Sequence, residues 1–210
     1  MSKNTGKGFT KQELKLLNSL NTPEKIQDFL DNLPTNWEPE GDTCISPIRV
    51  LRENRGHCIE AAMFAAMVLQ MHGHEPLILD LTANRKDQDH VIALFKRDGH
   101  WGAIAKSNHY CLGYRDAVHR TVRELVMTYF HEYLNRAGEK TLRSFSKPIN
   151  LKRFDKKGWR TAESDVWYIP ETIVAAPHMR ILTAKQERQL RHADEFTRDV
   201  NNIERQKKGV

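Results

Sequence analysis

Cys58 and His90 are the two residues of this sequence whose types and spacing are suited to covalent catalysis. Cys58 follows Arg55-Gly56-His57 and opens a run of small and apolar residues, which predicts a buried helix over residues 58–72. The free N–H groups and the dipole at a helix start lower the pKa of a thiol there and favour the nucleophilic thiolate. The N–H of Cys58 is also placed to bind an oxyanion, and Gly56 leaves room for a substrate carbonyl.

His90 stands at the start of a predicted strand, after a polar loop, where its ring can reach a groove while Val91 and Phe95 anchor the strand. A thiol nucleophile requires an imidazole within hydrogen-bonding reach, first as a base and then as an acid. A helix packed on a sheet provides that reach, so we pair His90 with Cys58. His57, although adjacent to Cys58, is expected to point elsewhere.

The elements around this pair are predicted to be helices before it and a sheet after it. Three short helices with a threonine or serine N-cap (Thr10, Thr22, Ser46) are expected at residues 9–20, 22–33 and 46–54. Three strands are expected at residues 76–81, 91–95 and 101–106. Asp98-Gly99 predicts a tight hairpin turn, and the unbroken apolar run at 91–95 predicts a strand covered on both faces.

The later part of the chain has weaker signals. Apolar residues recur at helical spacing over 115–137, which predicts the clearest helix of the chain. Residues 166–169 are the best strand candidate after it. From Ala184 the chain is highly charged, and its narrow apolar stripe predicts a peripheral or interface helix. We therefore expect a disordered tail over residues 1–8, one domain over 9–180, and a charged C-terminal helix or tail over 181–210.

The composition is that of an ordinary globular chain, because 39% of its 210 residues are hydrophobic and 29% are charged. Cys44, Cys58 and Cys111 form an odd, scattered set, which disfavours a disulfide framework and favours a reducing compartment. No apolar run has the length of a membrane span, and the first residues are polar. These features predict a cytoplasmic protein with no membrane partner.

The formal net charge of +6 does not by itself predict a nucleic-acid partner. Lysine and arginine are spread along the chain and mixed with acidic residues, and no nucleic-acid-binding motif is present. A metal site is also disfavoured, because the potential ligands have no CxxC or HxxxH spacing. Those potential ligands are His57, Cys58, His90, His109 and Cys111.

One stretch of the sequence resembles the transglutaminase-like superfamily. It consists of Gly56-His57-Cys58, the alanine-rich apolar helix after it, Gly73, a strand, His90 and the hairpin to Trp101. The resemblance covers roughly residues 46–108, and the segment before Cys58 is similar to the lead-in of bacterial members. It implies an α+β, papain-like thiol fold, with a central helix packed on an antiparallel sheet and extra N- and C-terminal helices. It also implies a hydrolase or acyltransferase that acts on a protein or peptide amide without a cofactor.

One position departs from the family's pattern. The family commonly has an aspartate four residues after the hairpin tryptophan, and Ala105 stands there in this chain. A two-residue turn would place Ser107 opposite His90, whereas a three-residue loop would place Asn108 there. Asn108 would correspond to the Cys-His-Asn arrangement of thiol proteases.

The third catalytic group is therefore open. It is Ser107, Asn108, or an acid from another segment such as Asp80 or Asp89, unless the site is a Cys-His dyad.

Two functions follow from these residues. In the first, Cys58 attacks an amide carbonyl, His90 shuttles the proton, and the acyl-enzyme passes to water or to an amine. In the second, motivated by Ala105, the chain is a catalytically inactive binding module that keeps the transglutaminase-like fold.

Overall fold

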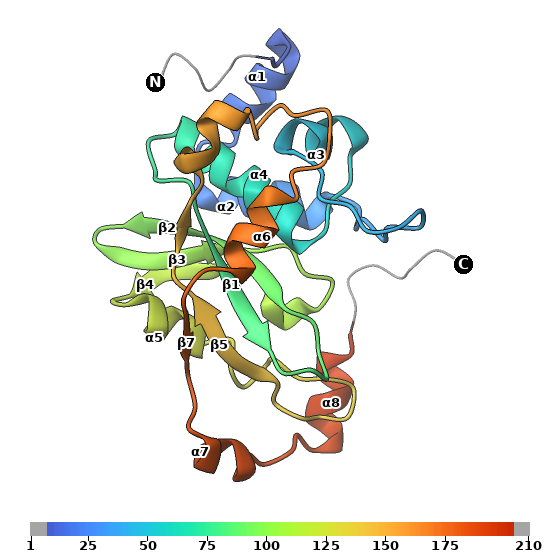
Figure 1. Cartoon of the computed structure of the whole chain (residues 1–210), viewed down its shortest axis with the longest axis vertical. Helices are drawn as coiled ribbons and strands as arrows, with labels where there is room; N and C mark the ends of the chain where they lie inside the picture. Colours follow the sequence, from blue (N-terminus) through green and yellow to red (C-terminus); the bar gives the residue numbers. More distant parts are fainter. Residues whose placement is uncertain (1–7, 204–210) are drawn as a thin grey trace.

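The apolar run at 91–95 is part of a seven-stranded antiparallel sheet (Figure 1). The structure is a computed structural model that describes residues 8–203 of the chain. The strands are β1 (Leu77–Ala83), β2 (His90–Arg97), β3 (His100–Ile104), β4 (Arg115–His119), β5 (Leu142–Ser146), β6 (Ile149–Asn150) and β7 (His178–Arg180). Their order is β4-β3-β2-β1-β5-β7, and β6 also pairs with β1. The predicted α+β class is confirmed.

The hairpin between β2 and β3 has the predicted two-residue turn. Arg97 pairs with His100, so only Asp98 and Gly99 lie between the strands. Both turn residues have positive φ (49° and 79°), as the tight turn that matches strand twist requires. The alternative of a three-residue loop is therefore wrong.

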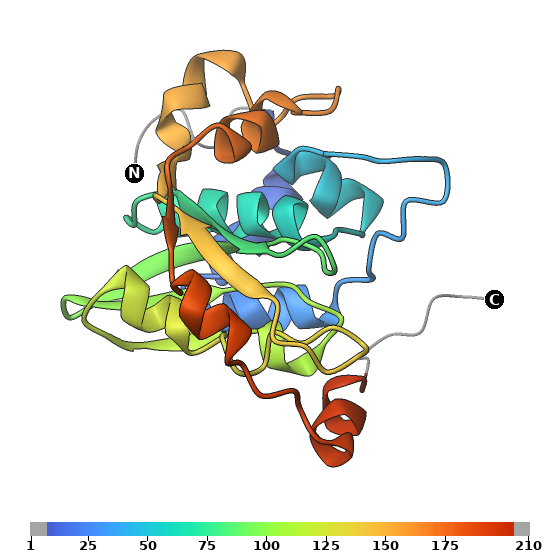
Figure 2. The same cartoon turned by 60° about the horizontal axis from the view of Figure 1, so that its bottom comes forward.

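Both faces of the sheet are covered, as the apolar run predicts. Neighbouring residues of a strand point to opposite faces, so Val91 joins one core cluster and Ile92 joins the other. The first cluster contains α4 (Cys58–Met71), the central helix, which is buried on nearly all sides. The second contains α5 (Val122–Met127). Figure 2 shows α4 and α5 on opposite sides of the strands.

The three predicted N-terminal helices are present. They are α1 (Lys11–Ser19), α2 (Pro23–Asn32) and α3 (Pro47–Glu53). The side chains of Thr10 and Thr22 accept bonds from backbone N–H groups of the first turn, as N-caps do. Ser46 does not cap α3 with its side chain, because its hydroxyl donates to the carbonyl of Ala162 (2.6 Å).

The prediction of one helix over 115–137 is wrong. The segment begins as β4, which lies close to β3 where Gly102 has no side chain: a Cβ there would be 2.8 Å from the Arg115 carbonyl oxygen. Thr121 then caps the short helix α5 by accepting from Glu124 N–H. The apolar residues of the segment are divided between these elements and the turns that follow, and Val118 is 65% exposed. Sheet pairing has overridden a helical period.

The predictions for the last part of the chain also change. Residues 166–169 lead into a helix, α6 (Tyr168–Val174), whose first turn tolerates Pro170 because the N–H groups there have no helical partner. The charged segment forms two short helices, α7 (Ala184–Arg188) and α8 (Glu195–Asn201), instead of one. Asn201 at the end of α8 is buried, so α8 is not simply peripheral.

Two 3₁₀ helices, η1 (Tyr110–Leu112) and η2 (Leu151–Lys157), complete the fold. Within residues 8–203, no helix combines the length and the apolar character needed to cross a bilayer. The tail predicted at the start of the chain lies outside the described residues, except for Gly8.

Candidate active site

The four predicted site residues line one cavity. Its volume is about 530 Å³, and Cys58, His90, Ser107 and Asn108 all contribute to its wall. The start of α4 provides the thiol, the start of β2 provides the imidazole, and the segment after β3 provides the other two. Helix α8 also reaches this cavity through Asn201.

Cys58 is the first residue of α4 and is half-buried, so its thiol sits at the positive end of the helix dipole. Burial by itself raises the pKa of this thiol. Hydrogen bonds and charge interactions with His57 and His90 outweigh burial and lower the pKa to about 5. The other two cysteines differ: burial raises the pKa of Cys111 to about 11 and that of Cys44 still higher. Cys58 is therefore the one described cysteine with thiolate character near neutral pH.

His90 is held by a backbone carbonyl. The residue is 5% exposed, and Nε2 lies 3.1 Å from the carbonyl oxygen of Leu112. A carbonyl only accepts hydrogen bonds, so Nε2 carries a hydrogen and Nδ1 is left for the Cys58 thiol. Ala105 is buried, and its backbone N–H and carbonyl are both bonded by the Gln27 side chain (3.0 and 2.9 Å).

The candidates for a third catalytic side chain have different surroundings. Ser107 lines the cavity, and its hydroxyl accepts from His109 N–H (3.0 Å). Asp89 also lines the cavity and accepts from Ala83 N–H (2.8 Å). Asp80 contacts Thr82 and His178 and is not part of the cavity wall. A catalytic role for Ser107 or Asn108 therefore stays a prediction. The Leu112 carbonyl orients the His90 ring, and a sequence motif made of side chains does not reveal such a backbone group.

The sequence predicts that His57 points away from Cys58, whereas in the structure His57 lies at the same cavity as Cys58. It is the N-cap residue of α4, lines the cavity, and its side chain hydrogen-bonds with the Cys58 thiol. Burial lowers the pKa of this imidazole, but the interactions with Cys58 and Glu60 outweigh burial and raise the pKa to about 9. A signal for this arrangement was present: Glu60 stands three residues after the N-cap, the spacing of a capping box.

Glu60 fastens the loop between α2 and α3 to the start of α4. Its carboxylate has no solvent exposure and accepts from the Asn36 amide, the Thr43 hydroxyl and the N–H groups of Ile45 and His57 (2.9 to 3.3 Å). The loop brings Asn36, Trp37 and Glu38 to the cavity wall. One buried carboxylate therefore links that wall to the helix that begins with Cys58.

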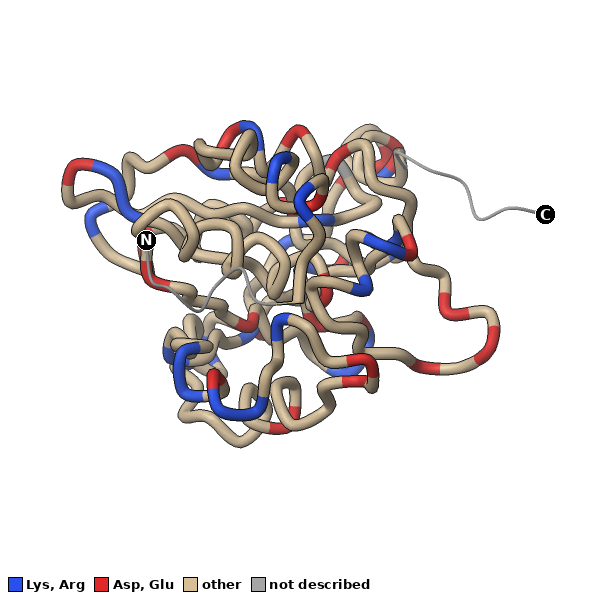
Figure 3. The backbone as a smooth tube through the Cα atoms, turned by 90° about the horizontal axis from the view of Figure 1, so that it is seen from above, with Lys and Arg blue, Asp and Glu red and all other residues tan. Residues whose placement is uncertain are grey.

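The same loop carries only acidic charges, which are Glu38, Glu40 and Asp42. Figure 3 shows it projecting from the body of the molecule, whereas basic and acidic residues are interleaved over the rest of the backbone.

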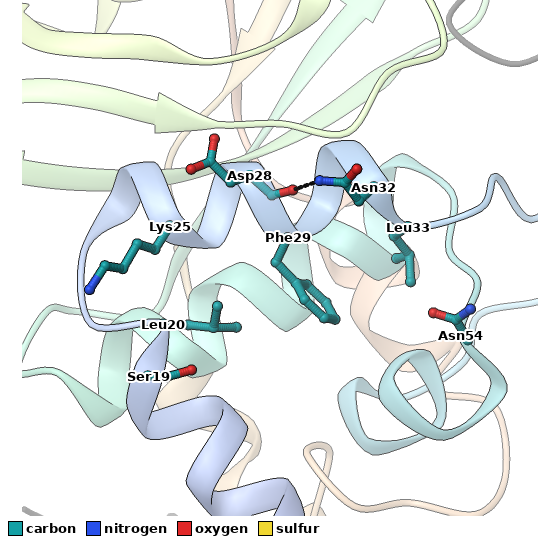
Figure 4. A pocket seen from close by; sticks show the side chains of 8 residues that line it. All are labelled: Ser19, Leu20, Lys25, Asp28, Phe29, Asn32, Leu33 and Asn54. Atoms are coloured by element: carbon teal, nitrogen blue, oxygen red, sulfur yellow. Dashed lines mark hydrogen bonds between the residues drawn. The ribbon is translucent and has the colours of Figure 1, made fainter.

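A second hollow, of about 600 Å³, lies between α1, α2 and the end of α3 (Figure 4). Leu20, Phe29 and Leu33 form its apolar part, and it is rimmed by polar side chains such as Lys25 and Asn54. Its described lining contains no cysteine and no histidine. In the described part of the chain, no three His, Cys, Asp or Glu side chains are grouped as a metal site requires.

Comparisons with known proteins give no family: no family model matches this chain, and no curated protein matches it either.

The reactivity of Cys58 should persist at acidic pH. At pH 6 a thiol with a pKa of about 5 is roughly 90% thiolate, against about 0.3% for a free cysteine with a pKa of about 8.5. This gives Cys58 an advantage of about 300-fold in thiolate concentration. A less basic thiolate is also a weaker nucleophile, by about 40-fold here, so the advantage in rate is the first factor divided by the second. We therefore expect Cys58 to react with dipyridyl disulfide about 10-fold faster than free cysteine at pH 6, with a rate that is flat above about pH 6.5.

The control is Cys58→Ser, which keeps Cys44 and Cys111 and should lose the fast phase. A wild-type rate that keeps rising with pH up to about pH 8.5, as free cysteine does, would contradict the lowered pKa.

Proposed function

We propose that this protein catalyses thiol-dependent acyl chemistry on an amide, with Cys58 as nucleophile and His90 as proton carrier, in a papain-like, transglutaminase-like fold. The observation that carries the proposal is a half-buried thiol that opens a helix and lines one cavity together with two imidazoles, His57 and His90, whose interactions lower its pKa. Structural cysteines are instead inert and have raised pKa values, as Cys44 and Cys111 do.

The proposed reaction begins when the Cys58 proton passes to His90. The thiolate sulfur forms a bond to the amide carbonyl carbon, and the carbonyl π electrons move to oxygen, which the Cys58 N–H stabilises at the helix start. The tetrahedral intermediate then breaks its C–N bond, and the amine leaves with the proton from His90. Neutral His90 next takes a proton from water, whose oxygen attacks the thioester and expels the Cys58 thiolate. An amine in place of water would give acyl transfer.

The cavity wall favours a protein or peptide amide that is not acidic. Glu38, Asp87 and Asp89 line it, and the carboxylate of Glu132 is already paired with Arg115. An acidic substrate would be repelled by these carboxylates, so we expect a neutral or cationic segment next to the scissile amide. All three cysteines are free, which is compatible with action in a reducing cytoplasm.

Acylation by p-nitrophenyl acetate tests the proposal. We expect a burst of about one p-nitrophenolate per chain, an acetyl group on Cys58 identified by peptide mapping, and slower steady turnover, because an acyl-enzyme forms and is then hydrolysed. Amidated peptides would then be tested for ammonia release. Cys58→Ser is the control and should show neither phase.

The second function, an inactive binding module, makes a different prediction. In that case the acetyl group would form slowly or remain on Cys58, with no turnover above the Cys58→Ser variant.

A further inference from the structure

We infer that His57 is a second catalytic imidazole at this site: a resident cation that contacts the Cys58 sulfur and is oriented by Glu38 and Glu60. The inference rests on the proposed function, because it assigns a role within the same reaction. It removes the need for an acid at position 105, since the carboxylates act on the histidine next to the nucleophile.

The geometry around His57 favours a protonated ring. Nε2 lies 3.1 Å from the carbonyl oxygen of Thr43, so this nitrogen carries a hydrogen. The same nitrogen is 3.4 Å from a carboxylate oxygen of Glu38 and 3.4 Å from one of Glu60. The other side of the ring faces the first turn of α4, where it meets the Glu60 N–H and interacts with the adjacent Cys58 thiol. A cation placed between two carboxylates and a thiolate is favoured by each of them.

His90 has the opposite arrangement. Its Nε2 contacts the neutral carbonyl of Leu112, and among the contacts within residues 8–203 none joins this ring to a carboxylate. We therefore infer different roles for the two imidazoles. His57, between the carboxylates, keeps its proton through the reaction, whereas His90, at a neutral carbonyl, transfers its proton.

This division has a consequence for the reaction. His90 gives its proton to the leaving amine and is neutral when the thioester is present. In the next step His90 takes a proton from water, and the C–S bond breaks with its electron pair remaining on sulfur. His57 keeps its own proton through both steps and stabilises the thiolate as it leaves. No proton is gained or lost over the cycle, because the one given to the amine is recovered from water.

Several other groups contribute to the field at His57. Glu38 comes from the loop before α3, and Cys58 and Glu60 come from α4. The remaining titratable groups of the cavity wall are Asp87, Asp89, His90, Lys106, His109, Cys111, Glu132 and Tyr133. Among these, the carboxylates add to the negative field that favours a cation, and the Lys106 ammonium is bonded to the carbonyls of Leu30 and Leu33.

The test compares the pH dependence of the reaction between Cys58 and dipyridyl disulfide in the full chain with His57→Gln and with His90→Gln. Removal of an adjacent cation raises a thiol pKa by about 1 to 3 units. We expect His57→Gln to move the acidic midpoint upward by about 2 pH units, and His90→Gln, whose ring also lowers the thiol pKa, to move it upward as well. A midpoint in His57→Gln within about half a unit of the wild type would overturn the inference.

Two further measurements keep the test independent of folding and of the proposed function. Cys58→Ser should lower the NMR titration midpoint of the His57 ring by more than about 1 pH unit, because the thiolate is removed, and an unchanged midpoint would also overturn the inference. If His57→Gln fails to fold, Glu38→Gln takes its place as the test variant. It lies at the edge of the cavity and should move the thiol midpoint upward by a smaller amount than His57→Gln. Absent turnover of p-nitrophenyl acetate in the wild type would count against the proposed function, whereas an unmoved thiol midpoint counts against His57.

Discussion

Replacement of His90 by alanine is expected to lower the steady turnover of p-nitrophenyl acetate by about 10²- to 10⁴-fold, the usual contribution of a general acid–base. The loss should fall mainly on hydrolysis of the acyl-enzyme, because water has to give a proton to His90 before it attacks the thioester. The initial burst should change much less, since nitrophenolate leaves without a proton and the Cys58 thiolate still contacts His57. Steady-state and burst kinetics on the same sample separate the two steps.

His100→Ala is the matched control, because this histidine lies at the β2–β3 turn and bonds only to the nearby carbonyl of Asp98 among the contacts described. It should leave both phases unchanged. His90 is buried, so the melting temperature of each variant has to be measured, and His90→Gln provides a second variant that retains a donor for the Leu112 carbonyl. Unchanged turnover in a folded His90 variant would remove His90 from the reaction.

Replacement of Glu60 by leucine is expected to lower the free energy of unfolding by about 3 to 5 kcal/mol. The carboxylate accepts from four groups, including the N–H groups of Ile45 and His57, and each buried donor left without a partner costs about 1–3 kcal/mol. Water from the cavity can satisfy some of these donors, so the full sum is not reached. Urea unfolding of the two chains measures the difference.

Glu40→Leu is the control for this change, because Glu40 is an exposed acid on the loop that Glu60 fastens. We expect it to alter the free energy of unfolding by less than about 0.5 kcal/mol. A loss below about 1 kcal/mol for Glu60→Leu would mean that the loop and the start of α4 do not depend on this carboxylate.

Local signals were sufficient for the parts of the fold that position the candidate pair. The N-caps of α1 and α2, the apolar helix α4 and the Asp98-Gly99 turn each depend on a few neighbouring residues, and the structure contains all of them. The helix predicted over 115–137 failed because its apolar period is also compatible with a strand followed by a short helix. Pairing with β3 favours the strand, because Gly102 of β3 has no side chain and the backbone of β4 can approach it closely.

The sequence by itself identified the candidate nucleophile and its proposed partner, since a thiol at a helix start and a histidine at a strand start are properties of short segments. The two cores on either side of the sheet then place these starts at one cavity. Only the tertiary structure decided which groups orient the imidazoles. The Leu112 carbonyl belongs to the backbone and has no residue type to detect, and Glu38 reaches His57 through a loop held by Glu60. Contacts of this kind depend on how distant segments pack, and no spacing along the chain records them.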